Sequence, residues 1–254
     1  MKFSNANVKV ERLYWHGSFY SWLTDYRRIY SADLLSGHSC PFASKCLSKV
    51  VIKKGKKKIV DGPDIDHRCY SASEEVIFPV VYDRRAGNYK QMRGLNLPEL
   101  VKAIEDGHPD DLGICRIHSA GDFFNKTYFR AWLEIARNNK QNLYYAYTKS
   151  LPYWLEYRKL IPENMVLTAS RGGRCDHLIK PRRLREAIVV KHPEDAEAMG
   201  LEIDHDDSHA ANPATRKQNF ALLIHGRQPP GSEASQALKR MKAEGISFSY
   251  KRRR

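Results

Sequence analysis

Three cysteines in the first third of the chain are the residues best suited to chemistry. Cys40 and Cys46 lie in the segment SGHSCPFASKC, and Cys69 follows in DHRCYSAS. Thiolates bind soft iron, so three of them in one irregular region could hold an iron–sulfur cluster that leaves one iron open for a ligand. With His38 or His67 as a fourth ligand, the same thiols would form a structural zinc site. Free thiols without a metal are the third interpretation.

The other two cysteines have different surroundings. Cys115 lies in the apolar stretch ICRIH, where a cysteine is usually a small buried hydrophobic residue. Cys175 follows SRGGR, and a helix start beside Arg174 could lower the pKa of its thiol. In a reducing compartment five cysteines fit a disulfide framework poorly, and the odd number adds to that doubt, so metal binding, catalysis or burial must explain them.

The segment EIDHDDSHA is a second group of potential metal ligands. Carboxylates and histidines bind divalent cations, which would suit a metal-dependent hydrolase. A solvated acidic loop is the alternative interpretation of the same residues. The candidate ligands in this segment are Asp204, His205, Asp206, Asp207 and His209.

Length and composition indicate a folded globular protein. A chain of 254 residues with 42% hydrophobic side chains can bury a sizeable core. We expect a single α/β domain over residues 1–254, with an irregular cysteine-bearing region at 1–96 and β/α repeats at 97–254. The sequence contains no run of about 18 apolar residues that could span a bilayer, and its N-terminus lacks the apolar core of a signal peptide. We therefore expect a cytoplasmic protein, in the host cytosol if phage-encoded, with no membrane partner.

The net charge of +14 favours an anionic partner. Six lysines fall within residues 49–58, four basic residues within 180–185, and the chain ends KRRR. Such clusters attract phosphates and release counterions on binding, which predicts nucleic acid or another polyanion as the partner. A solvated loop and a frayed tail would explain the same clusters without any partner.

The hydrophobic pattern predicts alternating strands and helices. Short β-rich stretches, RRIYSADLL and VIFPVVYD, flank the cysteine region. Beyond them, Asn125 is an expected helix N-cap and Pro98 lies in an expected first turn. Short apolar strands that alternate with amphipathic helices indicate parallel strands joined by crossovers, either in a doubly wound sheet or in a full or partial barrel. The expected strands are 114–118, 142–148, 164–170, 186–191 and 219–226, and the expected helices are 97–107, 125–139, 150–160, 193–200 and 232–245.

Polar and charged residues follow most of these strands. Chemistry in parallel sheets collects at the carboxyl ends of the strands, so we expect these residues to form one binding rim. Turn and capping preferences explain part of the pattern, but they do not explain the histidines, lysines and arginines. The residues expected on the substrate side of the rim are His118, Lys149, Lys191 and His225.

The ordered motifs SGHSCPFASKC, RCYSASEE, RIHSAGDFF, YAYTKS and LTASRGGR resemble the phage and plasmid family named after mycobacteriophage gene product eighty-eight. The resemblance covers about residues 34–176 and implies a relative without implying a reaction. The layout in turn is similar to that of radical S-adenosylmethionine (SAM) enzymes. That likeness implies a partial (β/α) barrel of about six parallel strands, the first near residues 28–34.

The radical-SAM likeness also implies roles for particular residues. Cys40, Cys46 and Cys69 would hold a [4Fe-4S] cluster. The spacing of these cysteines departs from the usual C-x3-C-x2-C, and an Asp stands where a Glu is usual. The residues placed at the SAM amino group are Ala120, Gly121 and Asp122, and those placed at its carboxylate are Ser170 and Arg171.

The sequence thus predicts an iron–sulfur enzyme of phage or plasmid origin that is radical-SAM-like and acts on nucleic acid or a nucleotide. The alternative is a non-catalytic nucleic-acid-binding or host-modulating phage protein with a structural zinc site. Iron with acid-labile sulfide would support the first function, and stoichiometric zinc would support the second.

Overall fold

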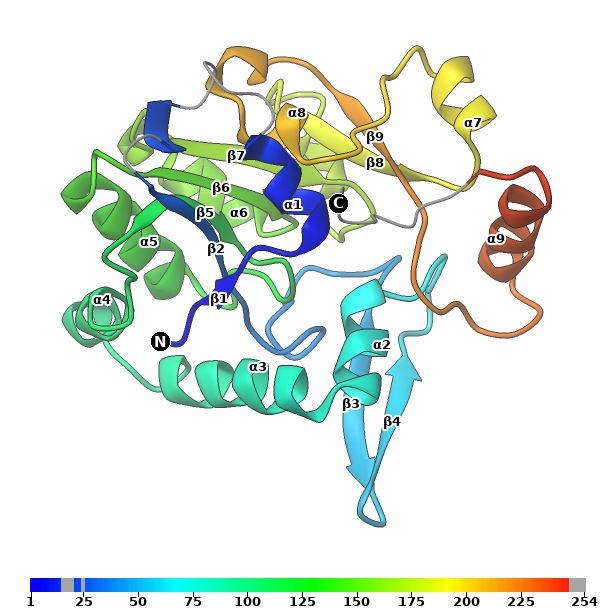
Figure 1. The fold of residues 1–254 in the computed structure, drawn as a ribbon, viewed down its shortest axis with the longest axis horizontal. Helices are drawn as coiled ribbons and strands as arrows, with labels where there is room; N and C mark the ends of the chain where they lie inside the picture. The colour runs from blue at the N-terminus through cyan, green and yellow to red at the C-terminus, as the bar shows by residue number, and fades with distance from the viewer. Residues whose placement is uncertain (15–20, 24–25, 247–254) are drawn as a thin grey trace.

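The fold is built on one seven-stranded sheet (Figure 1). The computed structural model describes residues 1–14, 21–23 and 26–246. Strand β1 (Ser4–Asn5) pairs antiparallel with β2 (Arg28–Ala32), and every further neighbouring pair is parallel. The order is β1-β2-β5-β6-β7-β8-β9, so the six parallel strands lie side by side in chain order. The remaining strands are β5 (Leu112–Ile117), β6 (Leu143–Thr148), β7 (Met165–Ser170), β8 (Glu186–Val190) and β9 (Phe220–Leu223).

The mixed α/β class and the mostly parallel sheet are as the sequence predicts, and the first parallel strand begins at Arg28 as expected. In the described part of the chain β9 and β1 do not pair, so the sheet is open. The N-terminal region contributes β1 and β2 to the same sheet as the later repeats.

Helices cover both faces of the sheet. Helices α4 (Leu97–Glu105) and α5 (Lys126–Asn138) pack on one face, where Trp132 is fully buried. Helices α1 (Val8–Glu11) and α8 (Ser208–Ala211) supply Val10 and two alanines to a core cluster on the other face. The later helices are α6 (Leu151–Glu156), α7 (Pro193–Ala198) and α9 (Glu233–Ala243).

The expected helix starts agree with the structure. Asn96 and Glu99 form a reciprocal capping box at α4, with Pro98 in the first turn, and the side chain of Asn125 accepts a hydrogen bond from Tyr128 N at the start of α5. The helix expected at 150–160 is shorter, because α6 ends at Glu156 and a 3-10 turn, Arg158–Leu160, follows.

Two stretches of the N-terminal region differ from expectation. The segment VIFPVVYD, predicted as β-rich, spans the end of helix α2 (Tyr70–Ile77) and the start of α3 (Pro79–Met92). Pro79 occupies the first turn of α3, where its missing N–H breaks no helical hydrogen bond. Its preference for a helix start outweighs the preference of the neighbouring β-branched residues for a strand. The lysine-rich run forms a two-stranded hairpin of β3 (Ser48–Lys53) and β4 (Lys56–Asp61), which projects from the body of the protein (Figure 1).

Candidate functional site: a thiol cavity at the strand ends

Cys40, Cys46 and Cys69 line one cavity of about 170 Å³, here called the thiol cavity. The same cavity is lined by residues at the carboxyl ends of four strands, β5, β6, β7 and β9, so the cysteine region and these strand ends lie around one cavity. The lining residues predicted from the sequence as part of the rim are His118, Ala120, Gly121, Asp122, Lys149, Ser170 and His225.

Close backbone approach brings the cysteine loop to the sheet. Gly37 has φ +67°, and a Cβ there would lie 2.3 Å from the carbonyl oxygen of Ser48. Gly121 has φ +90°, and a Cβ there would lie 2.5 Å from the Oγ of Ser39, one residue before Cys40. Only glycine tolerates both the left-handed backbone and the contact, so Gly121 lets the cysteine loop reach the end of β5.

The thiols of the cavity are in an environment that favours the protonated form. Loss of water raises the pKa of Cys40 well above its usual range, and Asp122 and the other two thiols add to the shift. Desolvation and the neighbouring Cys46 raise the pKa of Cys69 to about 11. A nucleophilic cysteine needs a lowered thiol pKa, so these two thiols are not arranged for nucleophilic catalysis. A bound metal would supply the positive charge that favours thiolates.

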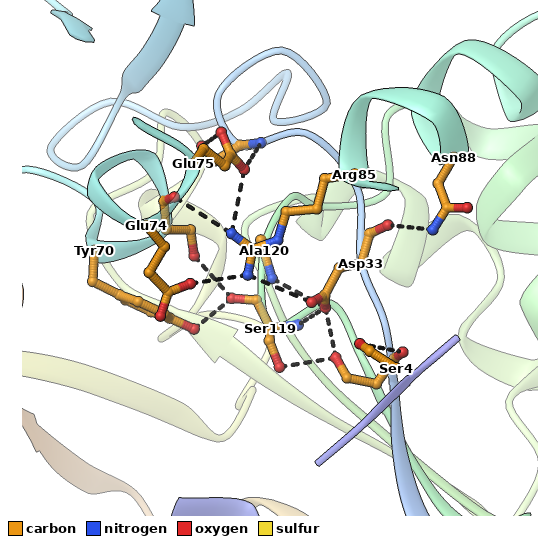
Figure 2. A network of polar contacts seen from close by, with 12 residues as sticks. Ser4, Asp33, Tyr70, Glu74, Glu75, Arg85, Asn88, Ser119 and Ala120 are labelled. Carbon is orange, nitrogen blue, oxygen red and sulfur yellow. Dashed lines mark hydrogen bonds and ion pairs between the residues drawn. The ribbon is translucent and has the colours of Figure 1, made fainter. Parts of the chain in front are cut away.

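A buried ion-pair network, here called the Arg85 network, contacts Ser119 and Ala120, two residues that line the cavity (Figure 2). The guanidinium of Arg85 lies 3.0 Å from a carboxylate oxygen of Glu74 and 3.5 Å from oxygens of Glu75 and Asp33. Arg85, Glu75 and Asp33 are all buried. Three carboxylates around one cation keep the pKa of Arg85 high, whereas burial raises the pKa of Glu75.

The Arg85 network connects the segments that carry the cysteines. Glu75 of α2 accepts hydrogen bonds from the backbone N–H and the hydroxyl of Ser36, which precedes Cys40 (3.0 and 2.7 Å). Asp33 accepts hydrogen bonds from the N–H groups of Ser119 and Ala120 at the end of β5 (2.8 and 3.4 Å). These bonds tie the helix that begins after Cys69, the loop before Cys40 and the end of β5 to one another.

Asp122 links the carboxyl ends of β5 and β6 through hydrogen bonds. Its carboxylate accepts hydrogen bonds from Phe123 N (2.7 Å), Thr148 Oγ1 (2.6 Å) and Lys149 N (2.8 Å). Burial raises its pKa, although these three bonds oppose the shift. A carboxylate has about four acceptor positions, so three occupied ones give Asp122 a structural role and leave about one position for a ligand.

The rim histidines are uncharged. Burial lowers the pKa of His118 to about 3, and its Nε2 lies 3.1 Å from the hydroxyl of Tyr128. Burial also lowers the pKa of His225, whose ring packs against that of Tyr70 at a centroid distance of 4.6 Å. Both residues therefore present neutral imidazoles to the cavity at neutral pH.

A second cavity, of about 360 Å³, adjoins the first. The two cavities share Tyr70, Arg116, Tyr147 and His225 among their lining residues. The second cavity continues past this common wall toward the acidic segment (residues 202–209). A ligand at the thiols thus has space beside it for a second molecule.

Two of the predicted rim residues lie outside the lining of the thiol cavity. Arg171 forms an ion pair with Glu186 at 2.6 Å, and Lys191 forms ion pairs with Asp66 and Glu233 at 2.9 and 2.8 Å. Their roles at the carboxylate of SAM and on the substrate side stay predictions, and the existing ion pairs oppose them.

The two histidines considered as zinc ligands differ in position. His67 lines the thiol cavity, with its Nδ1 3.4 Å from Asp66, and burial lowers its pKa. His38 instead has its Nε2 2.9 Å from the carbonyl oxygen of Val50. Within residues 1–14, 21–23 and 26–246, no group of three His, Cys, Asp or Glu side chains is placed to hold a metal ion.

The two remaining cysteines lie away from the cavity. Cys115 is fully buried in β5, as predicted. The expectation for Cys175 is wrong: its pKa is raised, because desolvation and the neighbouring Asp176 outweigh the effect of Arg174.

The acidic segment is neutralised by the protein itself. Asp207 lies 2.7 Å from both Lys9 and Arg116 and accepts hydrogen bonds from Tyr145 and Tyr147. The other acidic side chains are engaged as well: Asp206 accepts a hydrogen bond from Ser208 N, and Glu202 and Asp204 lie beside His209. Carboxylates already paired with cations and hydroxyls are poorly placed to bind a divalent metal, so the hydrolase interpretation receives no support from this arrangement.

Sequence reasoning missed several residues at the site. Asp33 follows the first parallel strand, so the rule that located the other strand ends would also have found it. Arg85 and Glu75 lie on helices that were not predicted, so no local signal indicated their roles. The aromatic residues Tyr70 and Tyr147 line both cavities and were also missed.

These features define the class of protein: an open, mostly parallel α/β protein with a thiol-lined cavity at the carboxyl ends of its strands. The family model described as "Gene product 88" matches residues 2–243, so the chain belongs to the Gene product 88 family, and the expected phage relationship is confirmed. No solved structure matches the chain. None of the described helices is both long and apolar enough to cross a membrane.

Two curated phage proteins are similar to this chain. It is 26% identical over 122 residues to the Gene 88 protein of Mycobacterium phage L5 and, over the same length, to that of Mycobacterium phage D29. Each alignment covers 44% of this chain, with 44% of the L5 protein and 43% of the D29 protein. The match therefore spans less than half the length of these relatives.

Proposed function

We propose that this Gene product 88 protein is an iron–sulfur protein in which Cys40, Cys46 and Cys69 hold a [4Fe-4S] cluster. The observation that carries the proposal is that these three thiols, from two separate segments, line one cavity at the ends of the parallel strands. Three protein ligands would leave one iron of such a cluster without a ligand from the protein.

We expect the three thiols to suit a cluster better than a single ion. Tetrahedral zinc requires its sulfur ligands at about 2.3 Å from one point, and the described residues are not grouped in that way. A cubane cluster binds each thiolate through a different iron, so its ligand sulfurs lie farther apart than those around one ion. The Arg85 network would hold the two cysteine-bearing segments in place for such a cluster.

The radical-SAM-like part of the proposal rests on the rim. The six parallel strands lie in chain order, as strands of a partial (β/α) barrel do. Gly121 permits close backbone approach, Asp122 retains about one acceptor position for an ammonium group, and Ser170 offers a hydroxyl to a carboxylate. When bound, a cluster of this type supplies one electron to its ligand. His118, Lys149 and His225 would face the substrate, and the adjoining cavity would hold it.

Metal analysis after anaerobic purification tests the proposal. We expect about four iron and four sulfide per chain with little zinc. Stoichiometric zinc without sulfide would favour the structural zinc site with His67 as the fourth ligand. A protein that binds neither iron nor zinc after reconstitution would contradict both metal-binding functions.

Calorimetric titration with SAM tests the radical-SAM-like part separately. The cluster-loaded protein should bind SAM, and Asp122→Asn should weaken binding without changing the iron content. Glu99→Gln, at the exposed start of α4, is a matched control that should bind SAM as the wild type does. If the protein carries its full cluster but shows no measurable affinity for SAM, the radical-SAM-like part of the proposal is wrong. The protein would then be a cluster protein with another ligand.

The basic hairpin, β3 with β4, favours nucleic acid as a partner. The strand register places Lys49, Lys53, Lys56 and Lys58 on one face, with Val51 and Val60 between them. The other face turns Val50 into the core and packs Lys57 over the ring of Tyr82 at 4.0 Å. A two-stranded ribbon with one basic face fits a nucleic-acid groove or backbone, and we propose that the hairpin docks there.

The basic cluster at residues 180–185 contributes less charge to a surface than its sequence indicates. Arg185 is buried and donates hydrogen bonds to Thr168 and to the backbone carbonyl of His209. Burial lowers its pKa to about 10. The terminal KRRR lies outside the described residues, so the hairpin carries the proposal.

The salt dependence of binding tests the hairpin. Replacing Lys49, Lys53, Lys56 and Lys58 by Gln should reduce the slope of log K against log salt by up to about 3, at about 0.7 to 0.9 per phosphate contact. A matched variant with Gln at Lys102, Lys126, Lys140 and Lys239 should change the slope much less. Equal slopes for the two variants would contradict docking by the hairpin, and no binding at low salt would remove nucleic acid as the partner.

A further inference from the structure

One cation of the thiol cavity has no anionic partner at ion-pair distance. Lys149 is 9% exposed, and its Nζ donates a hydrogen bond to the Oγ of Ser170 at 2.6 Å. Across the described ranges, none of the ion pairs includes Lys149. A buried charge without an opposite charge beside it is costly, and an anion that binds next to it reduces that cost.

The other buried cations near the cavity differ in this respect. Arg85 is paired with three carboxylates, and Arg116 lies 2.7 Å from Asp207. Asp122 and His67 are titratable groups whose pKa values the charge of Lys149 lowers, and the side chain of Lys45 lies near that of Lys149 at Gly172. Asp122 interacts with the lysine at longer range but accepts a hydrogen bond only from its backbone N–H, and His67 is neutral because burial lowers its pKa.

The surroundings hold the lysine side chain in place. Its stem packs against the two glycines after β7, and a Cβ at Gly173 would lie 3.1 Å from the Cβ of Lys149. Gly172 and Gly173 are in turn fixed by their N–H groups, which donate to the carboxylate of Asp176 at 2.8 and 3.0 Å. The glycines of SRGGR therefore make room for Lys149.

We propose that Lys149 and Ser170 form a binding site for an anionic oxygen group, a carboxylate or a phosphate, of a small ligand in the thiol cavity. The Oγ of Ser170 accepts a hydrogen bond from the lysine, so its own hydrogen is available to donate. The ammonium and the hydroxyl thus provide two donors for one oxyanion. The inference concerns the cavity of the proposed function but does not depend on a cluster, because neither group is a thiol.

Thermal unfolding with two probe anions tests the site. The protein as purified is titrated with inorganic phosphate or with acetate, and chloride keeps the ionic strength constant. The melting temperature of the wild type should rise with the preferred anion, because a ligand that binds the folded state stabilises it. A rise with phosphate alone assigns a phosphate ligand, and a rise with acetate alone assigns a carboxylate.

Substitutions locate the effect. Lys149→Met should weaken anion binding by about tenfold or more, since a hydrogen bond to a charged group is lost. Ser170→Ala keeps the charge and should weaken binding several-fold, so it serves as a second test if Lys149→Met fails to fold. Lys126→Met, at an exposed lysine that pairs with Glu156, is the matched control and should respond as the wild type does.

Two results would overturn the inference. One is a wild-type protein that neither phosphate nor acetate stabilises. The other is equal stabilisation of the wild type, Lys149→Met and Ser170→Ala. Because the readout is anion binding and not iron content, either result leaves the cluster assignment to be decided by metal analysis.

Discussion

In the sequence, the thiol cavity and the acidic segment (residues 202–209) are equally rich in potential ligand residues. In the fold, they differ in whether those residues are paired with other groups of the protein. In the acidic segment, Asp207 is matched by Lys9 and Arg116, and His209 lies beside Glu202 and Asp204. In the cavity, Cys40 and Cys69 lie close enough to other thiols for these to raise their pKa values, and none of the ion pairs in the described chain includes Lys149. Ligand-type side chains indicate a site when the protein leaves them without partners.

The cost of burial explains why this difference is informative. A buried charge whose partners are present is stable by itself and needs no ligand. An ammonium without an opposite charge gains stability when an anion binds, and neutral thiols become thiolates when a metal binds. We therefore expect substitutions in the acidic segment to act on folding and substitutions of the cavity thiols to act on binding.

The largest effect on stability is expected at Asp207. Asp207→Asn leaves the buried guanidinium of Arg116 without its partner and should lower the free energy of unfolding by about 3 to 5 kcal/mol. Urea denaturation measures the change. Asp110→Asn, at an exposed position, is the control and should cost less than about 0.5 kcal/mol. A loss below about 1 kcal/mol for Asp207→Asn would show that the acidic segment is not a structural ion-pair centre.

The next effect is expected in the Arg85 network. Arg85→Met leaves Asp33 and Glu75 buried without their shared cation, and the free energy of unfolding should fall by about 3 kcal/mol. The same variant should bind less iron, because Glu75 and Asp33 position the two cysteine-bearing segments. Arg93→Met, at the exposed end of α3, should change neither property. Full iron content in a folded Arg85→Met protein would show that iron binding does not depend on the Arg85 network.

A smaller effect is expected at Gly121. Gly121→Ala places a Cβ against Ser39 at a backbone φ of +90° and should cost about 1 to 3 kcal/mol. Gly87→Ala is a matched control, because Gly87 lies within α3 with no atom within 4 Å of an added Cβ. That substitution should stabilise the protein by about 0.5 to 1 kcal/mol. Thermal and urea unfolding distinguish the two, and equal effects would argue against close approach of the cysteine loop.

The smallest effect is expected from the titration of His209. Asp204 and Glu202 raise the pKa of His209 to about 9, above its ordinary value of 6.5. A raised folded-state pKa stabilises the protein fully below about pH 6.5, and this contribution is lost as the pH rises through about 9. We expect the free energy of unfolding to fall by about 1 kcal/mol over this range, a value that already includes solvent screening at this partly exposed pair. His209→Gln should flatten the unfolding free energy over this range, and an unchanged slope would contradict the assignment.

Much of the fold can be predicted from local signals. Alternating apolar strands and amphipathic helices give the parallel sheet, and caps such as Asn96 and Asn125 place helix starts, because these signals lie within a few residues of the element that they control. The stretch VIFPVVYD was predicted incorrectly because β-branched residues dominate it, whereas Pro79 and the packing of α3 decide its conformation. The hairpin turn at Lys54 and Gly55 was missed because the lysine-rich run was interpreted only as a cluster of charge. The turn can be recognised when the residues on either side of it are considered as two β-strands.

The site is predictable to a lesser extent. The strand-end rule located Gly121, Asp122 and Lys149, since parallel strands bring their carboxyl ends to one edge. It could not show that Arg171 pairs with Glu186, because strand register decides which neighbouring side chain a residue meets. The contacts of Arg85 with Asp33 and Glu75 join segments that are far apart in the sequence, and no local pattern encodes them.

The most direct test of the central claim is the iron and sulfide content of single cysteine variants purified anaerobically in parallel. Cys40→Ala, Cys46→Ala and Cys69→Ala should each lose the brown colour and most of the iron and sulfide. Cys175→Ala, outside the cavity, should retain both and is the matched control. If Cys69→Ala keeps its full iron and sulfide, the three thiols do not hold one cluster and the account is wrong.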